Sequence, residues 1–155
     1  MENDLSFVVD GMLGRLGKYL RALGYDTLYD SALGESIFAH GSSEGRVIVT
    51  ARTAVPSSAG GPVVRIDHDS IERQLAALFE QLGVRASRER VLTVCLECNL
   101  PTGEVPVEQV AGEVPASVRE SQSTCRVCPG CGKVYWWGSH ADRIMERLEE
   151  SGVFG

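Results

Sequence analysis

Two pairs of cysteines with identical spacing constrain this chain more than any other feature. Cys95 and Cys98 form one C-x-x-C motif, and Cys128 and Cys131 form a second, with residues 99–127 between them. Each motif lets two thiolates reach the same tetrahedral ion, and two such motifs are the usual pattern of a structural zinc ribbon. The spacing therefore predicts one structural zinc ion held by these four cysteines.

A fifth cysteine, Cys125, precedes Cys128 at the same spacing and offers an alternative second pair. We favour Cys128 with Cys131 because the Pro-Gly sequence between them is typical of a tight turn. The pairing of Cys125 with Cys128 stays open as the alternative. Four thiolates leave no open coordination position, so we expect a structural site that does not need His140 as a ligand.

Short apolar strands alternate with helices in the first half of the chain. Apolar residues at helical spacing predict helices over 12–23 and 71–82, and a weaker helix within 34–45. Asp69 with Glu72 resembles a capping box in front of the helix over 71–82. This alternation predicts an α/β fold with a mostly parallel sheet flanked by helices. The expected strands are 5–10, 26–29, 46–50 and 63–66.

The composition changes near residue 84, where an arginine-rich stretch over 83–90 is typical of a junction. We therefore expect an α/β domain over 1–88 and a zinc ribbon with a C-terminal helix over 89–155. No run approaches the roughly 18 apolar residues of a membrane span, and the start of the chain lacks the features of a signal peptide. We therefore expect a protein of the reducing cytoplasm, where clustered cysteines bind metal more often than they form disulfides.

Acidic residues follow several of the predicted strands. Asp10 ends the first strand, Asp30 and Glu35 follow the second, and Asp67 and Asp69 follow the fourth. Because ligand sites of parallel sheets lie at the carboxyl ends of the strands, these carboxylates are candidates to hold Mg²⁺ or Mn²⁺. Such ions orient water in phosphodiester cleavage. The alternative is local roles, with Asp69 as a helix cap, Asp30 in a turn and Asp10 bonded to the next loop.

Basic and aromatic residues suggest contacts with nucleic acid. The net charge of −6 does not favour a protein that coats nucleic acid, but clustered basic residues can still bind RNA. Trp136 and Trp137 either cover the junction with the ribbon or include one ring that stacks on an RNA base. The basic residues are equally explained as solvated helix charges. They are Arg15, Lys18 and Arg21 at spacing three, with Arg85, Arg88 and Arg90.

The chain resembles the Mut-seven C-terminal RNase domain family in four stretches: FVVDGMLGRLGKYLRALGYDT, EGRVIVTAR, CLECN and CPGCGKVYWWGSH. The resemblance runs over nearly the whole chain. The resemblance implies a PIN-like nuclease domain followed by a zinc ribbon. It implies a ribonuclease that depends on Mg²⁺ or Mn²⁺, with RNA as its partner.

Carried over to this chain, the resemblance implies Asp10 as the first acid of the catalytic site and Glu35 as the second. The family pattern at the end of the third strand resembles Thr-Arg-Asp, but Arg52 stands here at the position of the acid. Either Asp67 or Asp69 replaces the missing ligand, or the metal site is weak. A third option is that Arg52 binds an RNA phosphate, since a guanidinium suits bidentate contact with phosphate.

Two functions follow from these residues. The first is an active ribonuclease in which Arg15 and Lys18 contact phosphate. The second is a catalytically degenerate module that keeps the fold and binds RNA or a protein partner, and the arginine at position 52 is its main support. A thiol-based redox protein is a third, less favoured function.

Overall fold

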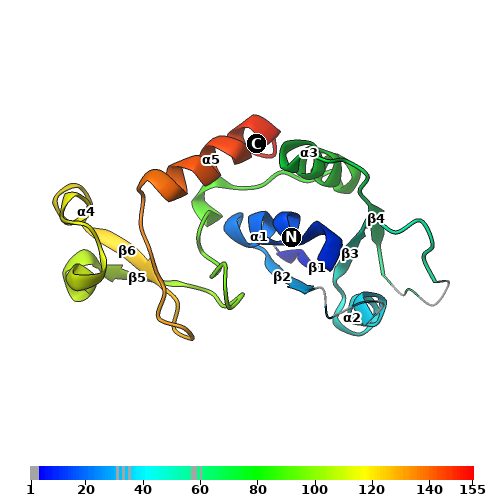
Figure 1. Cartoon of the computed structure of the whole chain (residues 1–155), viewed down its shortest axis with the longest axis horizontal. Coiled ribbons are helices and arrows are strands. Elements are labelled where there is room, and N and C mark those ends of the chain that lie inside the picture. Colours follow the sequence, from blue (N-terminus) through cyan, green and yellow to red (C-terminus); the bar gives the residue numbers. More distant parts are fainter. Residues whose placement is uncertain (1–3, 31, 33, 35, 57–58, 60) are drawn as a thin grey trace.

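The computed structural model describes residues 4–30, 32, 34, 36–56, 59 and 61–155. A parallel sheet with its helices comes first in the chain, and a smaller antiparallel sheet follows (Figure 1). In chain order the elements are β1 (Ser6–Asp10), the 3₁₀ turn η2 (Gly11–Leu13), α1 (Gly14–Ala22), β2 (Asp26–Asp30), α2 (Ser36–Glu44), β3 (Val47–Thr50), β4 (Val63–Arg65), α3 (Ile71–Leu82), η4 (Arg88–Arg90), β5 (Gly103–Pro106), η5 (Val107–Glu113), α4 (Ala116–Ser121), β6 (Thr124–Val127), β7 (Val134–Tyr135) and α5 (Ser139–Ser151).

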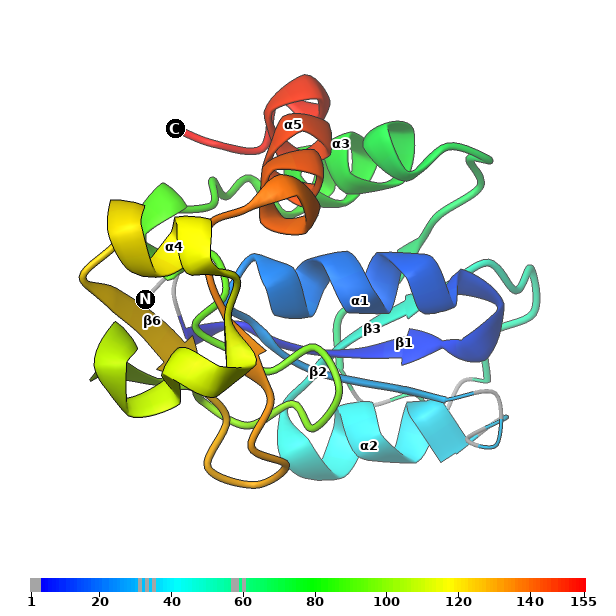
Figure 2. The same ribbon diagram turned by 60° about the vertical axis from the view of Figure 1, so that its left-hand side comes forward.

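The first sheet is parallel, with the strand order β2-β1-β3-β4. Helix α2 covers one face, and α1 covers the other, with α3 and α5 beyond it (Figure 2). Side chains of β1 alternate between these faces, as the two-residue period of a strand requires. Phe7 and Val9 enter the main core, whereas Val8 packs with Ile37 and Ile48 under α2. The predicted α/β fold with a flanked parallel sheet is therefore confirmed.

Two glycines allow α1 to pack closely on its neighbours. A Cβ atom at Gly17 would lie 2.4 Å from the ring of Tyr29, so the absence of a side chain there brings the helix onto β2. Gly24 follows the helix with φ of +91°, and a Cβ atom there would lie 2.5 Å from the Arg90 carbonyl oxygen. The chain therefore turns at Gly24 in a conformation that only glycine adopts without strain.

Helix α3 begins one residue later than the predicted capping box implies. Ser70 is the N-cap residue, and its hydroxyl accepts a hydrogen bond from the Arg73 N–H at 3.3 Å. The proposed cap by Asp69 is therefore wrong, because the serine next to it has the extended backbone that lets its side chain turn back onto the helix. The helix ends at Gly83, which has φ of +67°.

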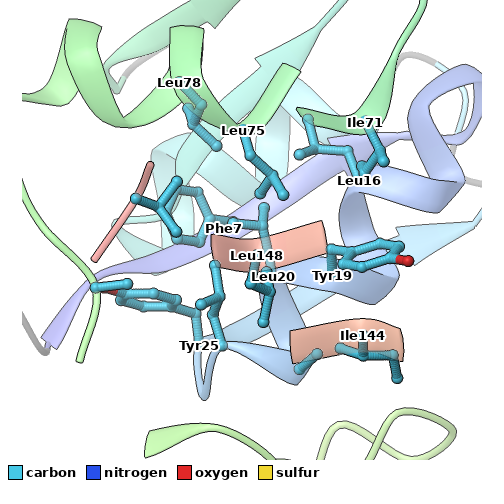
Figure 3. Packing of buried hydrophobic residues seen from close by; sticks show 14 of the residues in the cluster. Phe7, Leu16, Tyr19, Leu20, Tyr25, Ile71, Leu75, Leu78, Ile144 and Leu148 are labelled. Carbon is cyan, nitrogen blue, oxygen red and sulfur yellow. The ribbon is translucent and has the colours of Figure 1, made fainter. Parts of the chain in front are cut away.

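Helix α5 returns from the ribbon and packs on the parallel-sheet half of the chain. Its buried residues Ile144 and Leu148 join a cluster with Leu75 of α3 and Leu20 of α1 (Figure 3). The ion pair of Arg147 with Glu72, at 2.7 Å, also joins α5 to α3. One continuous core thus crosses residue 88, and the division into domains over 1–88 and 89–155 stays a prediction.

The second sheet is antiparallel, in the order β5-β6-β7. A small cluster of Val107, Val114 and Val118, with Trp136 against it, packs η5 and α4 on this sheet. The two C-x-x-C motifs lie in the turns beside it, so the predicted ribbon is present as a small separate sheet. No helix in the described part of the chain combines the length and apolar character that crossing a membrane requires.

Candidate functional site

The four predicted cysteine ligands lie together. Their Sγ atoms are all within 4.8 Å of one another, and the Sγ atoms of Cys95 and Cys131 are 3.7 Å apart. Zinc–sulfur bonds of about 2.3 Å place the sulfurs of a tetrahedral site ~3.8 Å apart, so this separation fits the ion. Among the described residues, these four cysteines are the group of Cys, His, Asp or Glu side chains that lies close enough together to bind one metal ion. His140 lies outside it, as predicted.

Hydrogen bonds orient the sulfurs of the two motifs. The backbone N–H of Cys98 donates to Cys95 Sγ, and that of Gly130 donates to Cys128 Sγ, each at 3.4 Å. The Tyr135 hydroxyl accepts from the Leu96 N–H at 2.9 Å, which leaves its own hydrogen for Cys95 Sγ at 3.2 Å. Partners of this kind fix the orientation of metal ligands.

The pKa values of the thiols reflect this environment without a metal. Burial raises the pKa of Cys95, but the hydrogen bonds from Tyr135 and backbone N–H groups outweigh it and bring the pKa to about 7. The neighbouring thiols Cys131 and Cys128, together with burial, raise the pKa of Cys98 to about 12. Because four thiolates this close repel one another, a divalent cation between them would stabilise their ionised forms.

Cys125 is not part of this cluster. It lies within β6 opposite Val105, is buried, and has a pKa raised by burial and by the charge of Glu113. A buried thiol with a raised pKa packs as a small apolar side chain. The choice of Cys128 with Cys131 as the second pair therefore agrees with the structure, and Cys125 is the spare cysteine.

The first cysteine motif is anchored to the parallel sheet. Asn99 has φ of +63°, a left-handed conformation that asparagine adopts more readily than most residues. Its side chain accepts from the Thr27 N–H at 2.8 Å and donates to Asp26 Oδ1 at 2.6 Å. The start of β2 and the turn after Cys98 are thus held together.

Arg21 is a second anchor between the parallel sheet and the first cysteine motif. The sequence suggests instead that its side chain is exposed and contacts phosphate. It is buried, and it donates to the carbonyl oxygens of Thr27 at 2.9 Å, Leu96 at 2.9 Å and Glu97 at 3.3 Å. Its guanidinium also lies 4.4 Å from the ring centroid of Tyr29. The proposed place of Arg21 in a basic strip is therefore wrong, because this side chain ties α1 and β2 to the cysteine motif.

Asp10 ends β1 at the carboxyl edge of the parallel sheet, as predicted. Its Oδ1 atom accepts from the Met12 N–H at 3.2 Å, and its Oδ2 atom accepts from Thr50 Oγ1 at 2.9 Å and Arg52 Nε at 3.0 Å. Asp10 is only 4% exposed, so these partners replace water around the carboxylate. Burial raises its pKa, but the hydrogen bonds and the Arg52 charge together lower the pKa below its usual range. The carboxylate is therefore ionised at neutral pH.

The other acidic candidates are less closely engaged. Asp67 is exposed after β4, with its carboxylate 3.5 Å from Arg65, and Asp69 is exposed as well. Asp30 lies opposite Asp10 in the register of β1 and β2, and its carboxylate accepts from the Ala32 N–H at 2.8 Å. Glu35 lies outside the described residues. The assignment of Asp10, Glu35, Asp67 and Asp69 as metal ligands stays a prediction.

The remaining arginines of the suggested strip have structural partners. Arg85 donates to the carbonyl oxygens of Gly152 and Phe154, and Arg88 pairs with Glu149 at 2.7 Å. Arg90 donates to the carbonyl oxygen of Gly24. By contrast, Arg15 is exposed and Lys18 is half-buried on the same helix. Arg15 and Lys18 remain the candidates for phosphate contact on α1.

Two residues that shape these sites have no predicted role in the sequence. Thr50 is part of a predicted strand, and pairing of Val9 with Val49 in the parallel register places it beside Asp10. Tyr135 is part of a motif, and its hydroxyl contact with Cys95 depends on long-range folding. A register argument could have found Thr50, but no local signal points to the role of Tyr135.

Fold and site define a class: an α/β protein with a parallel sheet, an acidic residue at its carboxyl edge, and an appended four-cysteine ribbon suited to zinc. A comparison with protein families gives a match to the Mut7-C RNAse domain over residues 5–148. The chain therefore belongs to the Mut7-C RNase domain family. Comparisons with curated proteins and with solved structures give no match.

Proposed function

We propose that this chain is a ribonuclease that depends on a divalent metal and cleaves RNA phosphodiester bonds, with a structural zinc ion in its ribbon. The observation that carries the proposal is the buried, ionised Asp10 at the carboxyl edge of the central parallel sheet, in a member of an RNase domain family. We place the protein in the cytoplasm because a zinc-bound set of free cysteines suits a reducing compartment.

In this proposal Asp10 and Glu35 hold Mg²⁺ or Mn²⁺, with Asp67 or Asp69 as a further ligand. The ion, when bound, would activate water and stabilise the leaving oxygen. Thr50 and the Met12 N–H keep the Asp10 carboxylate ionised and fixed in orientation. Arg15 and Lys18 attract the phosphate backbone through their charges.

The test is cleavage of single-stranded RNA in the presence of Mn²⁺. We expect the wild type to cleave and Asp10→Asn to lose cleavage, because the neutral amide removes one charged ligand. Arg119→Gln is a matched control, since it changes one exposed charge on α4 without touching Asp10. Cleavage that persists at the wild-type rate in Asp10→Asn would overturn the proposal.

A second candidate function, a module that binds RNA or a protein without cleavage, is favoured by one observation. Arg52 Nε lies 3.0 Å from Asp10 Oδ2, so a cation of the protein already neutralises the carboxylate. Repulsion between a divalent ion and a guanidinium this close amounts to several kcal/mol at a moderate effective dielectric. The Arg52 side chain is 32% exposed, so it can also turn toward a bound phosphate.

The substitution Arg52→Asp separates the two functions. If the site is otherwise intact, exchanging a repelling cation for an acidic ligand should raise Mn²⁺ affinity and RNA cleavage above the wild type. An inactive wild type together with an inactive Arg52→Asp variant that still binds RNA would support the binding module. The control is Arg119→Asp, which makes the same change of charge on α4.

A further inference from the structure

A cavity of about 370 Å³ lies between β7, α4 and the first turn of α5. Its volume is within the range of pockets that bind small ligands. Every residue of the stretch 135–140 except Trp137 lines the cavity. This aromatic stretch has no role in the acidic site, so the cavity is where its function is to be sought. Apolar side chains such as Leu92, Leu96 and Ile144 also line the cavity.

Aromatic and apolar groups form the walls of this cavity. Trp136 is half-buried between the cavity and the valine cluster under α4, and Tyr135 lies beside it. A Cβ atom at Gly138 would lie 2.9 Å from Trp136 Nε1, so glycine allows the indole to lie against the backbone. Aromatic rings held in this way suit stacking with a flat, unpaired base.

Basic residues lie at and near the cavity although the chain as a whole carries a net charge of −6. None of its lining residues is acidic, and Lys133 is among them. Burial and the charges of Lys18, Lys133 and Arg143 lower the pKa of His140, another lining residue, so these three cations are close enough to act on the imidazole. Lys133 also makes an exposed ion pair with Glu97 at 3.3 Å. This positive rim complements a phosphate backbone.

We infer that this cavity accepts one unpaired base of single-stranded RNA, whose neighbouring phosphates contact Lys18, Lys133 and Arg143. The inference rests on the proposed action on RNA and names single-stranded RNA as its substrate class. A duplex has no free base to insert. Lys18 and Arg15 are neighbours on α1, which begins just after Asp10 and η2. A strand anchored in the cavity is thereby directed along α1 toward the acidic edge.

The test is binding of a fluorescently labelled oligouridylate of roughly eight nucleotides, measured by anisotropy without added Mg²⁺ or Mn²⁺. Loss of one stacked base weakens binding roughly 5- to 100-fold, and we expect this loss in Trp136→Ala. Trp137→Ala is the matched control, because Trp137 is exposed and does not line the cavity. Quenching of tryptophan fluorescence by the RNA should persist in Trp137→Ala and disappear in Trp136→Ala.

A second pair of variants covers the case in which Trp136→Ala fails to fold. Ser117→Glu places an acidic group in the cavity wall, and we expect it to weaken binding by about 5-fold through repulsion of phosphate. Ala116→Glu makes the same change of charge at the neighbouring exposed position outside the lining. Equal affinities of both variants would overturn the inference.

An abasic strand of the same length tests for the base itself. We expect it to bind the wild type at least about 5-fold more weakly than the oligouridylate, and equal binding would overturn the inference. Asp10→Asn separates this result from the proposed function, because it should lose cleavage and keep binding. If the wild type binds RNA through Trp136 but does not cleave it, only the ribonuclease proposal is contradicted.

Discussion

Replacing Arg21 with methionine should strongly destabilise the protein, although Arg21 lies on a helix that looks basic and solvated in the sequence. The guanidinium donates to the carbonyl oxygens of Thr27, Leu96 and Glu97 and is buried. Methionine keeps most of the apolar stem but leaves these carbonyl groups without a donor. At about 1–3 kcal/mol for each buried group left unsatisfied, and with Glu97 near solvent, we expect a loss of about 3–5 kcal/mol.

The assay is urea denaturation with excess zinc, followed by circular dichroism. Arg15→Met on the same helix is the control, because an exposed arginine should change the free energy of unfolding by less than about 0.5 kcal/mol. We also expect zinc to be lost faster to a chelator in Arg21→Met, since the Leu96 and Glu97 carbonyl groups lie within the first cysteine motif. Equal stability of the two variants would refute this account of Arg21.

Three further predictions concern the cysteines, α1 and the acidic edge. Cys98→Ser should abolish binding of about one zinc ion per chain, whereas Cys125→Ser should retain it, as measured by elemental analysis. Gly17→Ala should destabilise the fold by about 1–3 kcal/mol in urea, whereas Gly14→Ala, whose Cβ would make only ordinary contact, should not. The lowered pKa of Asp10 contributes stability that is fully present above its usual pKa of 3.8 and is lost as the pH falls through its lower value in the folded protein. The free energy of unfolding of Asp10→Asn, measured in urea, should therefore fall less steeply at acidic pH than that of the wild type.

Local patterns predicted the parallel sheet and its two long helices, because those elements have strong signals of their own. The strand ending at Asp10 and the apolar face of α1 both lie where the sequence predicts them. The cysteine cluster was also predictable, since C-x-x-C spacing brings two thiols to one ion and the Pro-Gly turn favours Cys128 with Cys131 over Cys125 with Cys128. The small discrepancy at Ser70 shows the limit, because adjacent capping residues compete over a single position.

The roles of individual charges could not be predicted, because they depend on contacts far apart in the sequence. Arg21 and Lys18 are one helical turn apart on α1, yet Arg21 is buried against a motif near residue 96. Arg52 was expected near the acids, but its direct bond to Asp10 follows from the parallel pairing of β1 with β3. Burial and register decide these roles, and neither can be obtained from spacing alone.

Binding of Mn²⁺, followed by electron paramagnetic resonance, tests the central claim that Asp10 holds a metal for RNA cleavage. The wild type should bind an ion, Asp10→Asn should lose it, and Arg52→Asp should bind it more tightly, because the guanidinium beside the carboxylate is gone. Equal Mn²⁺ binding by the wild type and Asp10→Asn would contradict the claim.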